Sequence, residues 1–172
     1  MILPFSTQLN AKPTYFVEKI LKCFDEREAS ESDKEMLREA IEKGYLDVWK
    51  YDDVTPKLHT IRKDEKNRWR PGTKIDFFIN CRQEDMFRFA PVLPVVSIQE
   101  FEVNYVPTGK NLDLQPIVFI DKKFFYHNLI SNDTSKMFLL AKNDGFDSIP
   151  AFFDYFNKDF KGKIIHWTDL SY

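Results

Sequence analysis

The stretch Lys74-Ile75-Asp76-Phe77-Phe78-Ile79-Asn80-Cys81 decides the fold class of this 172-residue chain. Its period of two places a row of apolar side chains, beginning at Ile75, on one face of an extended chain. That pattern is typical of a β-strand with one face in the core. Gln83-Glu84-Asp85 then turns the chain towards Phe87 and Phe89, so the whole segment is predicted to form a β-hairpin.

Segments with strand character also lie on both sides of this hairpin. They are residues 2–5, 96–105, 117–120, 123–126 and 163–167. The alternation in 96–105 shifts by one position before Phe101, which predicts a β-bulge near Gln99 or Glu100. The two short strands at 117–120 and 123–126 are predicted to surround a turn at Asp121-Lys122.

Two helices are predicted before the hairpin. Residues 16–24 carry apolar side chains spaced for a core-facing helix, and Thr14 is its predicted N-cap. Ser32-Asp33-Lys34-Glu35 has the spacing of a capping box and begins a second helix that ends at Lys43-Gly44. Between these helices, the polar and acidic residues 25–33 are predicted to be a solvated connection.

Together these elements predict an α+β fold in a single domain, residues 1–172. Helical character returns at 134–142 and 149–156, on either side of Asn143-Asp144-Gly145. The most economical arrangement is a small closed or half-closed β-barrel with helices on its flank. The 27 aromatic residues supply enough apolar area for a core of this size.

Composition excludes several classes of protein and site. The two cysteines, Cys23 and Cys81, suit neither a disulfide framework nor a metal-ligand cluster, so a reducing, cytoplasmic location is expected. No signal peptide and no apolar run of about 18 residues is present, so no membrane partner is expected. The three histidines are too dispersed for a metal site, and without a phosphate-cradling glycine loop no cofactor is predicted.

The charge is concentrated in residues 57–74. This segment carries seven Lys and Arg residues against two acidic ones, a net charge of +5, whereas the whole chain has a net charge of −2. Trp69 lies between Arg68 and Arg70, an arrangement that suits stacking on a base while guanidiniums bind phosphates. The alternative is that the Trp69 ring covers the edge of the core. Lys66 belongs to the same candidate nucleic-acid surface.

Lys57-Leu58-His59-Thr60-Ile61-Arg62 is the densest candidate for chemistry. A desolvated Lys57 can act as the base for the Thr60 hydroxyl, provided that a turn brings the two side chains together. In an extended chain Lys57 and Thr60 lie on opposite sides. The structural alternative is that Lys57 and Arg62 are solvated charges and Thr60 is an ordinary strand residue.

The spacing Lys57-x-x-Thr60-Ile61-Arg62, followed by Pro71-Gly72 and a strand, resembles the ASCH (activating-signal-cointegrator homology) domains of the PUA-like superfamily. Residues 140–146 and 162–167 resemble the closing helix-strand unit of ASCH-like proteins, including those of phages and bacterial mobile elements. The resemblance omits residues from about 24 to 56, which it marks as a helical insertion. It implies a PUA-like small mixed β-barrel with flanking helices and a cleft that binds RNA or a nucleotide.

One bacterial branch with a similar K-x-x-T-I-R stretch is an amidohydrolase that removes the acetyl group from N4-acetylcytidine. Carried over by resemblance, its catalytic Lys and Thr are Lys57 and Thr60, and its Glu falls on Asp144, whose side chain is one methylene shorter. Thr60 would then carry a transient acetyl ester. Arg62 would stabilise the oxyanion or hold a substrate phosphate, and Asp144 would bind the exocyclic amide or orient the water.

Three hypotheses for the function follow. The first is a binding module that recognises RNA or a modified nucleotide in a basic cleft through His59, Arg62, Lys66, Arg68, Trp69 and Arg70. The second is an amidohydrolase that deacylates N4-acetylcytidine-type nucleosides through Lys57, Thr60 and Asp144. The third is a protein-interaction module that uses the extra helix at 32–43.

Overall fold

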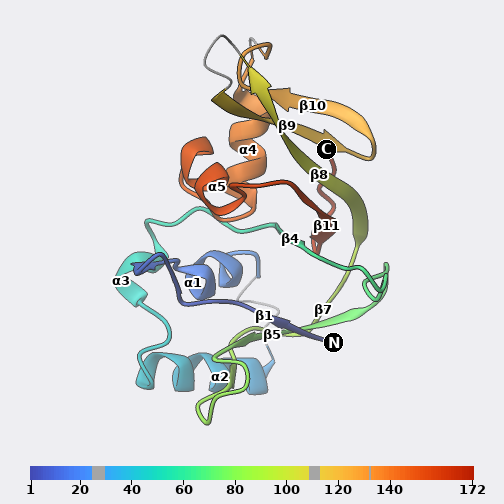
Figure 1. Ribbon diagram of the computed structural model, residues 1–172. Helices are drawn as coiled ribbons and strands as arrows, with labels where there is room; N and C mark the ends of the chain where they lie inside the picture. Colours follow the sequence, from blue (N-terminus) through green and yellow to red (C-terminus); the bar gives the residue numbers. More distant parts are fainter. Residues whose placement is uncertain (25–29, 109–112, 132) are drawn as a thin grey trace.

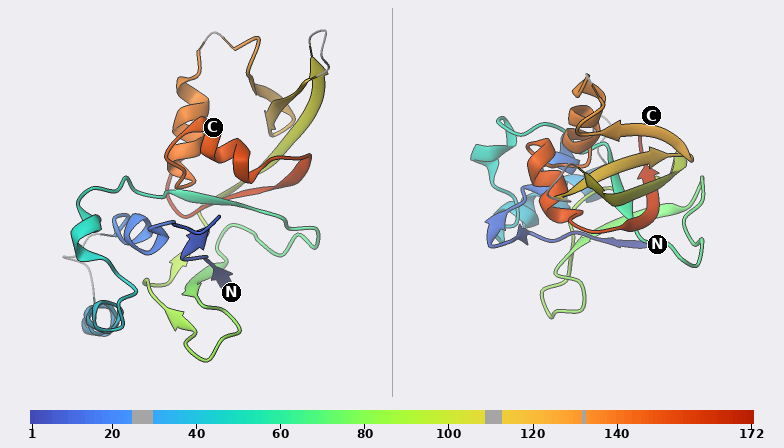
Figure 2. Two further views of the ribbon diagram at one scale, coloured as in Figure 1. Left: turned by 60° about the vertical axis from the view of Figure 1, so that its left-hand side comes forward. Right: turned by 45° about the horizontal axis from the view of Figure 1, so that its top comes forward.

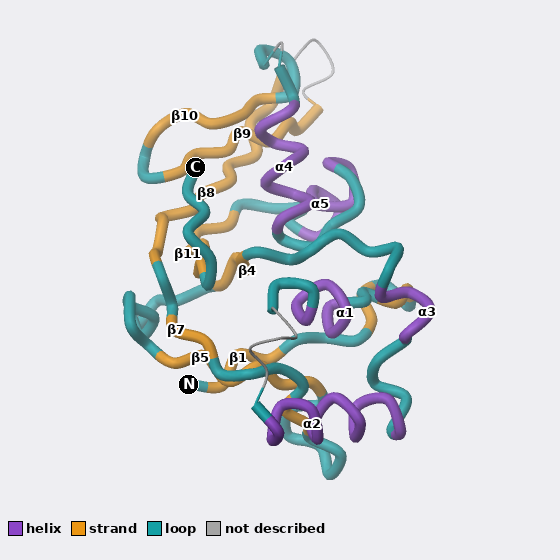
Figure 3. Tube along the Cα trace, turned by 180° about the vertical axis from the view of Figure 1, so that it is seen from behind, coloured by secondary structure: helices purple, strands orange, loops and turns teal. Residues whose placement is uncertain are grey.

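The structure, a computed structural model, describes residues 1–24, 30–108, 113–131 and 133–172. Its helices and strands form two halves, each with a sheet and helices of its own (Figures 1 and 2). One half holds the helices α4 and α5, and the other holds α1, α2 and α3, as the view from behind also shows (Figure 3). The predicted α+β class is confirmed.

The larger sheet has five strands, and every neighbouring pair in it is antiparallel. Its spatial order is β10 (Lys123–His127), β9 (Asp113–Ile120), β8 (Ser97–Thr108), β11 (Phe160–His166) and β4 (His59–Arg62). The helices α4 (Ser135–Asn143) and α5 (Ile149–Tyr155) pack against it. Phe101 and Phe152, both fully buried, are at the centre of the core between this sheet and the two helices.

The smaller sheet is centred on β5 (Lys74–Ile79). The strand β1 (Ile2–Pro4) pairs with it in parallel, and β6 (Phe87–Arg88) and β7 (Leu93–Pro94) pair with it antiparallel, so the predicted hairpin forms. A separate small hairpin joins β2 (Gln8–Leu9) to β3 (Lys12–Pro13). The helices of this half are α1 (Phe16–Leu21), α2 (Glu31–Glu42) and α3 (Val48–Tyr51), and its core is rich in aromatic side chains.

The strand β11 separates the two cores. Ile164 belongs to the core under α4 and α5, whereas the next residue, Ile165, belongs to the core of the other half. Within the described ranges, no strand pairing joins the edge strands β10 and β4 to close this sheet into a barrel. None of the described helices is long and apolar enough to cross a membrane.

The predicted bulge near Gln99 or Glu100 is wrong. The pairing of β8 with β11 runs without a break from Ser97 to Val103, and the irregularity of the larger sheet lies in β10 instead, between Phe124 and Tyr126. The alternation only appeared to shift because both faces of β8 are covered at this level. Ile98 packs against one core, and Gln99 is buried on the opposite face.

Two helix starts also differ from the prediction. The N-cap of α1 is Tyr15, in a left-handed conformation with φ of 53°, rather than Thr14. The capping box of α2 joins Ser30 to Asp33 rather than Ser32 to Glu35, because Ser30 accepts from Asp33 N and Asp33 accepts from Ser30 N. The end of α2 at Lys43-Gly44 is as predicted, and residues 25–29 of the predicted connection lie outside the described residues.

Candidate functional site

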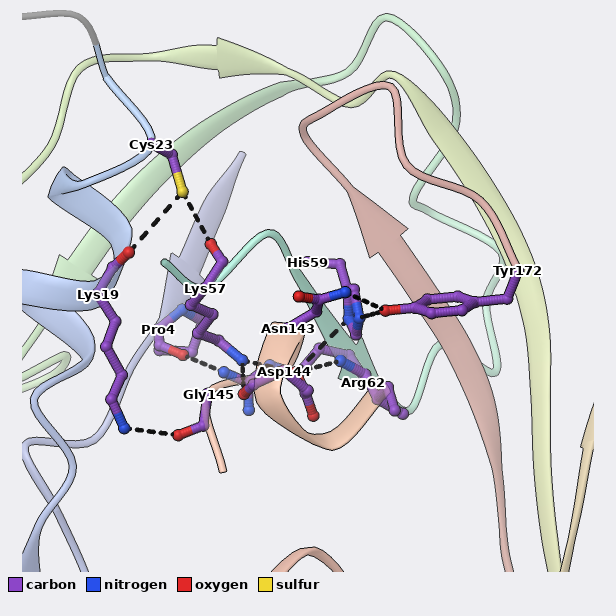
Figure 4. A network of polar contacts seen from close by, with 11 residues as sticks. Pro4, Lys19, Cys23, Lys57, His59, Arg62, Asn143, Asp144, Gly145 and Tyr172 are labelled. Atoms are coloured by element: carbon purple, nitrogen blue, oxygen red, sulfur yellow. Dashed lines mark hydrogen bonds and ion pairs between the residues drawn. The ribbon is translucent and has the colours of Figure 1, made fainter. Parts of the chain in front are cut away.

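Lys57 lies at the junction of the two halves, at the start of the segment that leads into β4 (Figure 4). Backbone hydrogen bonds fix this segment on both sides: Lys57 N donates to Lys19 O at 2.9 Å, and Leu58 N donates to Asn143 O at 2.8 Å. These bonds attach it to α1 and to the end of α4. The Lys57 side chain is only 1% exposed, so its ammonium is buried.

Asp144, the C-cap of α4, is the partner of that ammonium. Lys57 Nζ donates to Asp144 Oδ1 at 2.6 Å and also to the backbone carbonyl of Asp144. The same carboxylate oxygen accepts from Ile61 N at 3.2 Å. The chain can leave α4 here because Gly145 adopts φ of +91°, and a side chain at that position would press on Phe16 and Lys57.

Burial dominates the electrostatics of the pair. Burial lowers the pKa of Lys57 to about 8, although the neighbouring Asp144 carboxylate opposes this change. Burial raises the pKa of Asp144, opposed by Lys57 and by Arg62. At neutral pH the ammonium therefore keeps its proton, and the two side chains form a buried ion pair.

Two further cations lie close to the turn at Asp144 and Gly145. Lys19 Nζ donates to Gly145 O at 2.7 Å and lies 3.3 Å from the exposed carboxylate of Asp147. Arg62 stacks over the ring of Phe5, and its Nη2 donates to Pro4 O at 2.8 Å. Its buried Nε has no hydrogen-bond partner in the part of the chain that the structure describes.

A cavity of about 50 Å³ lies at this cluster and contains Thr60 in its wall. Its lining residues are Ser6, Leu9, Phe16, Lys57, Thr60, Ile61, Arg62, Asp144, Phe146 and Tyr155. A second hollow of about 170 Å³ shares the apolar and aromatic part of that wall, namely Leu9, Phe16, Phe146 and Tyr155. We call the two together the Lys57 cleft. Among the described residues the Thr60 hydroxyl makes no hydrogen bond.

The structure therefore brings four of the predicted site residues to one cavity: Lys57, Thr60, Arg62 and Asp144. Thr60 and Asp144 are 84 positions apart in the sequence. The ammonium of Lys57 is hydrogen-bonded to Asp144 and not to Thr60, so the predicted direct contact between lysine and threonine is absent from the described contacts.

The remaining predicted residues lie elsewhere. Lys66, Arg68 and Arg70 are exposed on the loop that follows β4 and do not line the Lys57 cleft. Trp69 is 6% exposed and packs in the core of the β5 half, so its ring is not available to stack on a base. The prediction of a stacking ring is therefore wrong, because this loop folds back through hydrogen bonds from Arg68 N and Trp69 N to the Asp64 carboxylate.

His59 has a role that the sequence did not indicate. It is fully buried behind Asp144 and outside the lining of the cleft, so it cannot touch a ligand there as predicted. Its Nε2 lies 2.7 Å from the hydroxyl of Tyr172, and Asn143 Nδ2 donates to that hydroxyl at 2.9 Å. These partners lie up to 113 positions away, so no local pattern signals the contact. The described residues contain no group of three or more His, Cys, Asp or Glu side chains placed for a metal ion.

Acidification is expected to destabilise the protein through His59 and His166. Both rings are fully buried, and burial lowers the pKa of His59 well below its usual range and that of His166 to about 4. In the unfolded chain both titrate near pH ~6.5, so below that pH the unfolded state binds more protons than the folded state. Urea denaturation should show the free energy of unfolding falling between pH ~6.5 and pH ~4, by about 2–3 kcal/mol for His166, and His59 should add to this fall.

The matched control is His166→Gln, whose amide nitrogen can take the place of His166 Nε2 opposite Gln99, at present 3.1 Å away. This variant removes one titrating ring and leaves every carboxylate unchanged. The difference between the two pH profiles therefore isolates His166, and the variant should show the flatter profile. Identical profiles would contradict the assignment.

Neither the known protein families, nor the curated proteins, nor the solved structures contain a match to this chain. The geometry of the Lys57 cleft is therefore the evidence for its function. This cleft combines the buried Lys57–Asp144 ion pair with aromatic walls. It also contains the Thr60 hydroxyl and Arg62 Nε, neither of which has a hydrogen-bond partner among the described residues.

Proposed function

We propose that this protein binds a nucleotide, free or within RNA, with the edge of the base at the Lys57–Asp144 pair. The main support for this proposal is the Lys57–Asp144 pair. Its two side chains are only 1% and 4% exposed, and both line a cavity. In this proposal the domain belongs to the ASCH type with a PUA-like arrangement, as the K-x-x-T-I-R resemblance implies.

A buried ion pair needs an explanation other than stability. Well-packed apolar residues of similar volume are often as stabilising or more so, because desolvating two charges costs more than their attraction returns. Ionisable groups with perturbed pKa values in a cleft are typical of functional sites. The perturbed pKa values of Lys57 and Asp144, and the place of both residues in the cleft wall, therefore favour a binding or catalytic role.

The polar groups of the cleft complement the edge of a cytosine. A carboxylate such as Asp144 accepts from an exocyclic amine, the group by which cytosine is distinguished in nucleic acids. Lys57, Arg62 and the Thr60 hydroxyl supply donors for a carbonyl oxygen or a phosphate. Arg62 Nε is buried and still lacks an acceptor among the described residues, so a ligand that supplies one removes an unfavourable desolvation.

The shape of the cleft also suits a base. The inner cavity of about 50 Å³ accommodates only a polar edge, and the adjoining hollow of about 170 Å³ leaves room for the rest of the ring. The walls of that hollow include the rings of Phe16, Phe146 and Tyr155, and aromatic faces are the usual stacking surfaces for unpaired bases.

Binding of cytidine 5′-monophosphate tests the proposal. Isothermal titration calorimetry should detect binding to the wild-type protein, and Arg62→Gln should weaken it by about 10- to 100-fold. That range corresponds to the loss of one hydrogen bond to a charged group. Wild-type protein that binds neither this nucleotide, nor N4-acetylcytidine, nor a short single-stranded RNA would contradict the proposal.

The matched control changes the exposed loop instead of the cleft. Arg68→Ala combined with Arg70→Ala removes two charges from positions that do not line the cleft. Affinity for the mononucleotide should stay unchanged in this double variant. If the loop also contacts RNA phosphates, the dependence of RNA affinity on salt should become less steep. An unchanged salt dependence would remove the loop from the interface.

A second candidate function, deacylation of an N4-acetylcytidine-type nucleoside, is favoured by one specific observation. Thr60, whose hydroxyl has no hydrogen-bond partner in the described part of the chain, and Lys57, whose pKa is lowered to about 8, line the same cavity. A neutral Lys57 would be the base for Thr60, and the pair with Asp144 would have to open first. Binding needs no such opening, so it is the first proposal.

A further inference from the structure

His59 presents an unused donor to the back of Asp144. Its Nδ1 lies 3.8 Å from Asp144 Oδ1, beyond hydrogen-bond distance, and has no partner in the described residues. The ring is fully buried between β4, the end of α4 and Tyr172 (Figure 4). A buried polar nitrogen without a partner is costly, so its position beside the carboxylate calls for a reason.

The hydrogen bonds of Tyr172 favour one of the two neutral forms of His59. Asn143 Nδ2 donates to the Tyr172 oxygen at 2.9 Å, so that oxygen already acts as an acceptor. Its own proton then has His59 Nε2, at 2.7 Å, as its acceptor. Burial holds the pKa of His59 well below its usual range, so the ring is neutral, and this arrangement leaves its single proton on Nδ1, facing Asp144.

We propose that His59 is a positioning residue of the Lys57 cleft, whose Nδ1–H binds the Asp144 carboxylate when a ligand draws the Lys57 ammonium away. The proposal rests on the proposed function, because only a ligand in the cleft competes for that ammonium. A movement of less than about 1 Å brings the 3.8 Å separation into hydrogen-bond range.

The charges around His59 explain why its ring stays neutral and its Nδ1–H makes no hydrogen bond to Asp144 while Lys57 is bound there. Lys57, on the segment leading into β4, disfavours a positive charge on the ring, and so does His166 on β11. Asp144 at the end of α4 is the one carboxylate among the described residues that forms a charge contact with it, and Tyr172 and Asn143 are uncharged. When Lys57 remains bound to Asp144, the ring stays neutral. When Lys57 leaves, the exposed negative charge favours both the Nδ1 hydrogen bond and protonation of the ring.

The test is nitrogen-15 NMR of the full chain without ligand, so its result does not depend on nucleotide binding. In the wild-type protein His59 should be neutral at pH 7, with the proton on Nδ1. In Lys57→Met, which removes the competing ammonium, the pKa of His59 should rise by at least about one unit towards its ordinary value near 6.5.

The control is Lys57→Met combined with Asp144→Asn, which removes the carboxylate as well and should cancel the rise. A wild-type ring protonated on Nε2 would overturn the proposal, and so would a His59 pKa that is the same in wild type and Lys57→Met. If Lys57→Met fails to fold, the wild-type tautomer still decides. Failure of the protein to bind cytidine 5′-monophosphate would contradict the proposed function alone. The tautomer and the pKa of His59 would still test its contact with Asp144.

Discussion

Asp144→Asn is expected to destabilise the protein by about 3–5 kcal/mol at pH 7, because the buried Lys57 then either keeps a charge without a counter-charge or gives up its proton. Asparagine keeps the shape of the side chain and an oxygen for Ile61 N, so the change is mainly electrostatic. Urea denaturation of the wild type and the variant at the same pH measures it.

The pH dependence of this variant has a defined sign. Without Asp144 the pKa of Lys57 falls further in the folded state, whereas in the unfolded chain it stays near 10.4. The unfolded state then binds more protons, so the stability of Asp144→Asn should rise with pH above neutrality, by up to about 1.4 kcal/mol per unit. Combining Lys57→Met with Asp144→Asn removes the lysine charge as well and should restore most of the stability lost in Asp144→Asn.

A matched control is Glu39→Gln, which breaks the ion pair of Lys43 and Glu39 on α2. That pair has a separation of 2.7 Å, close to the 2.6 Å between Lys57 and Asp144, but both of its side chains are about half exposed. Glu39→Gln should change stability far less than Asp144→Asn does, because an exposed ion pair is screened by water. If Asp144→Asn lowers the free energy of unfolding as little as Glu39→Gln does, the Lys57–Asp144 pair is not a desolvated ion pair.

The parts of this fold that the sequence predicted are those in which burial follows a local period. The hairpin around Gln83-Glu84-Asp85 and the helices before and after Asn143-Asp144-Gly145 depend on side chains two to four positions apart, which a single chain displays directly. The bulge prediction near Gln99 or Glu100 failed because Ile98 and Gln99, on opposite faces of β8, are both covered, and a period of two assumes that only one face is buried.

In the candidate site too, the sequence predicts the residues that local chemistry marks but not the contacts between distant residues. The chemistry of their side chains predicts Lys57 and Thr60, the family resemblance implies Asp144, and all three line one cavity. The contact of Lys57 with Asp144 spans 87 positions, so only tertiary structure decides it. For Trp69 the sequence left two alternatives: its basic neighbours favour a surface ring, whereas the structure packs the ring in the core.

The largest expected effect of a single substitution is on catalysis, the second candidate function. If the protein deacylates N4-acetylcytidine, Thr60→Val should reduce acetate release by about 10³-fold or more, because valine keeps the branched shape and removes the nucleophilic oxygen. The Thr60 proton goes to neutral Lys57, and the Thr60 oxygen bonds to the acetyl carbon. The C–N bond then breaks as the cytidine amine takes that proton, and water releases acetate from the Thr60 ester.

Two further measurements separate this mechanism from binding alone. Because the base must be neutral, kcat/KM should rise as the pH increases through the Lys57 pKa of about 8. Asp144→Glu restores the longer acid of the amidohydrolase branch and should raise turnover if the short side chain limits it. The contrary outcome is a wild-type protein that binds N4-acetylcytidine without releasing acetate, together with an equally inactive Asp144→Glu. The Lys57 cleft would then be a binding site, in which the Thr60 hydroxyl serves only as a hydrogen-bonding group for the ligand.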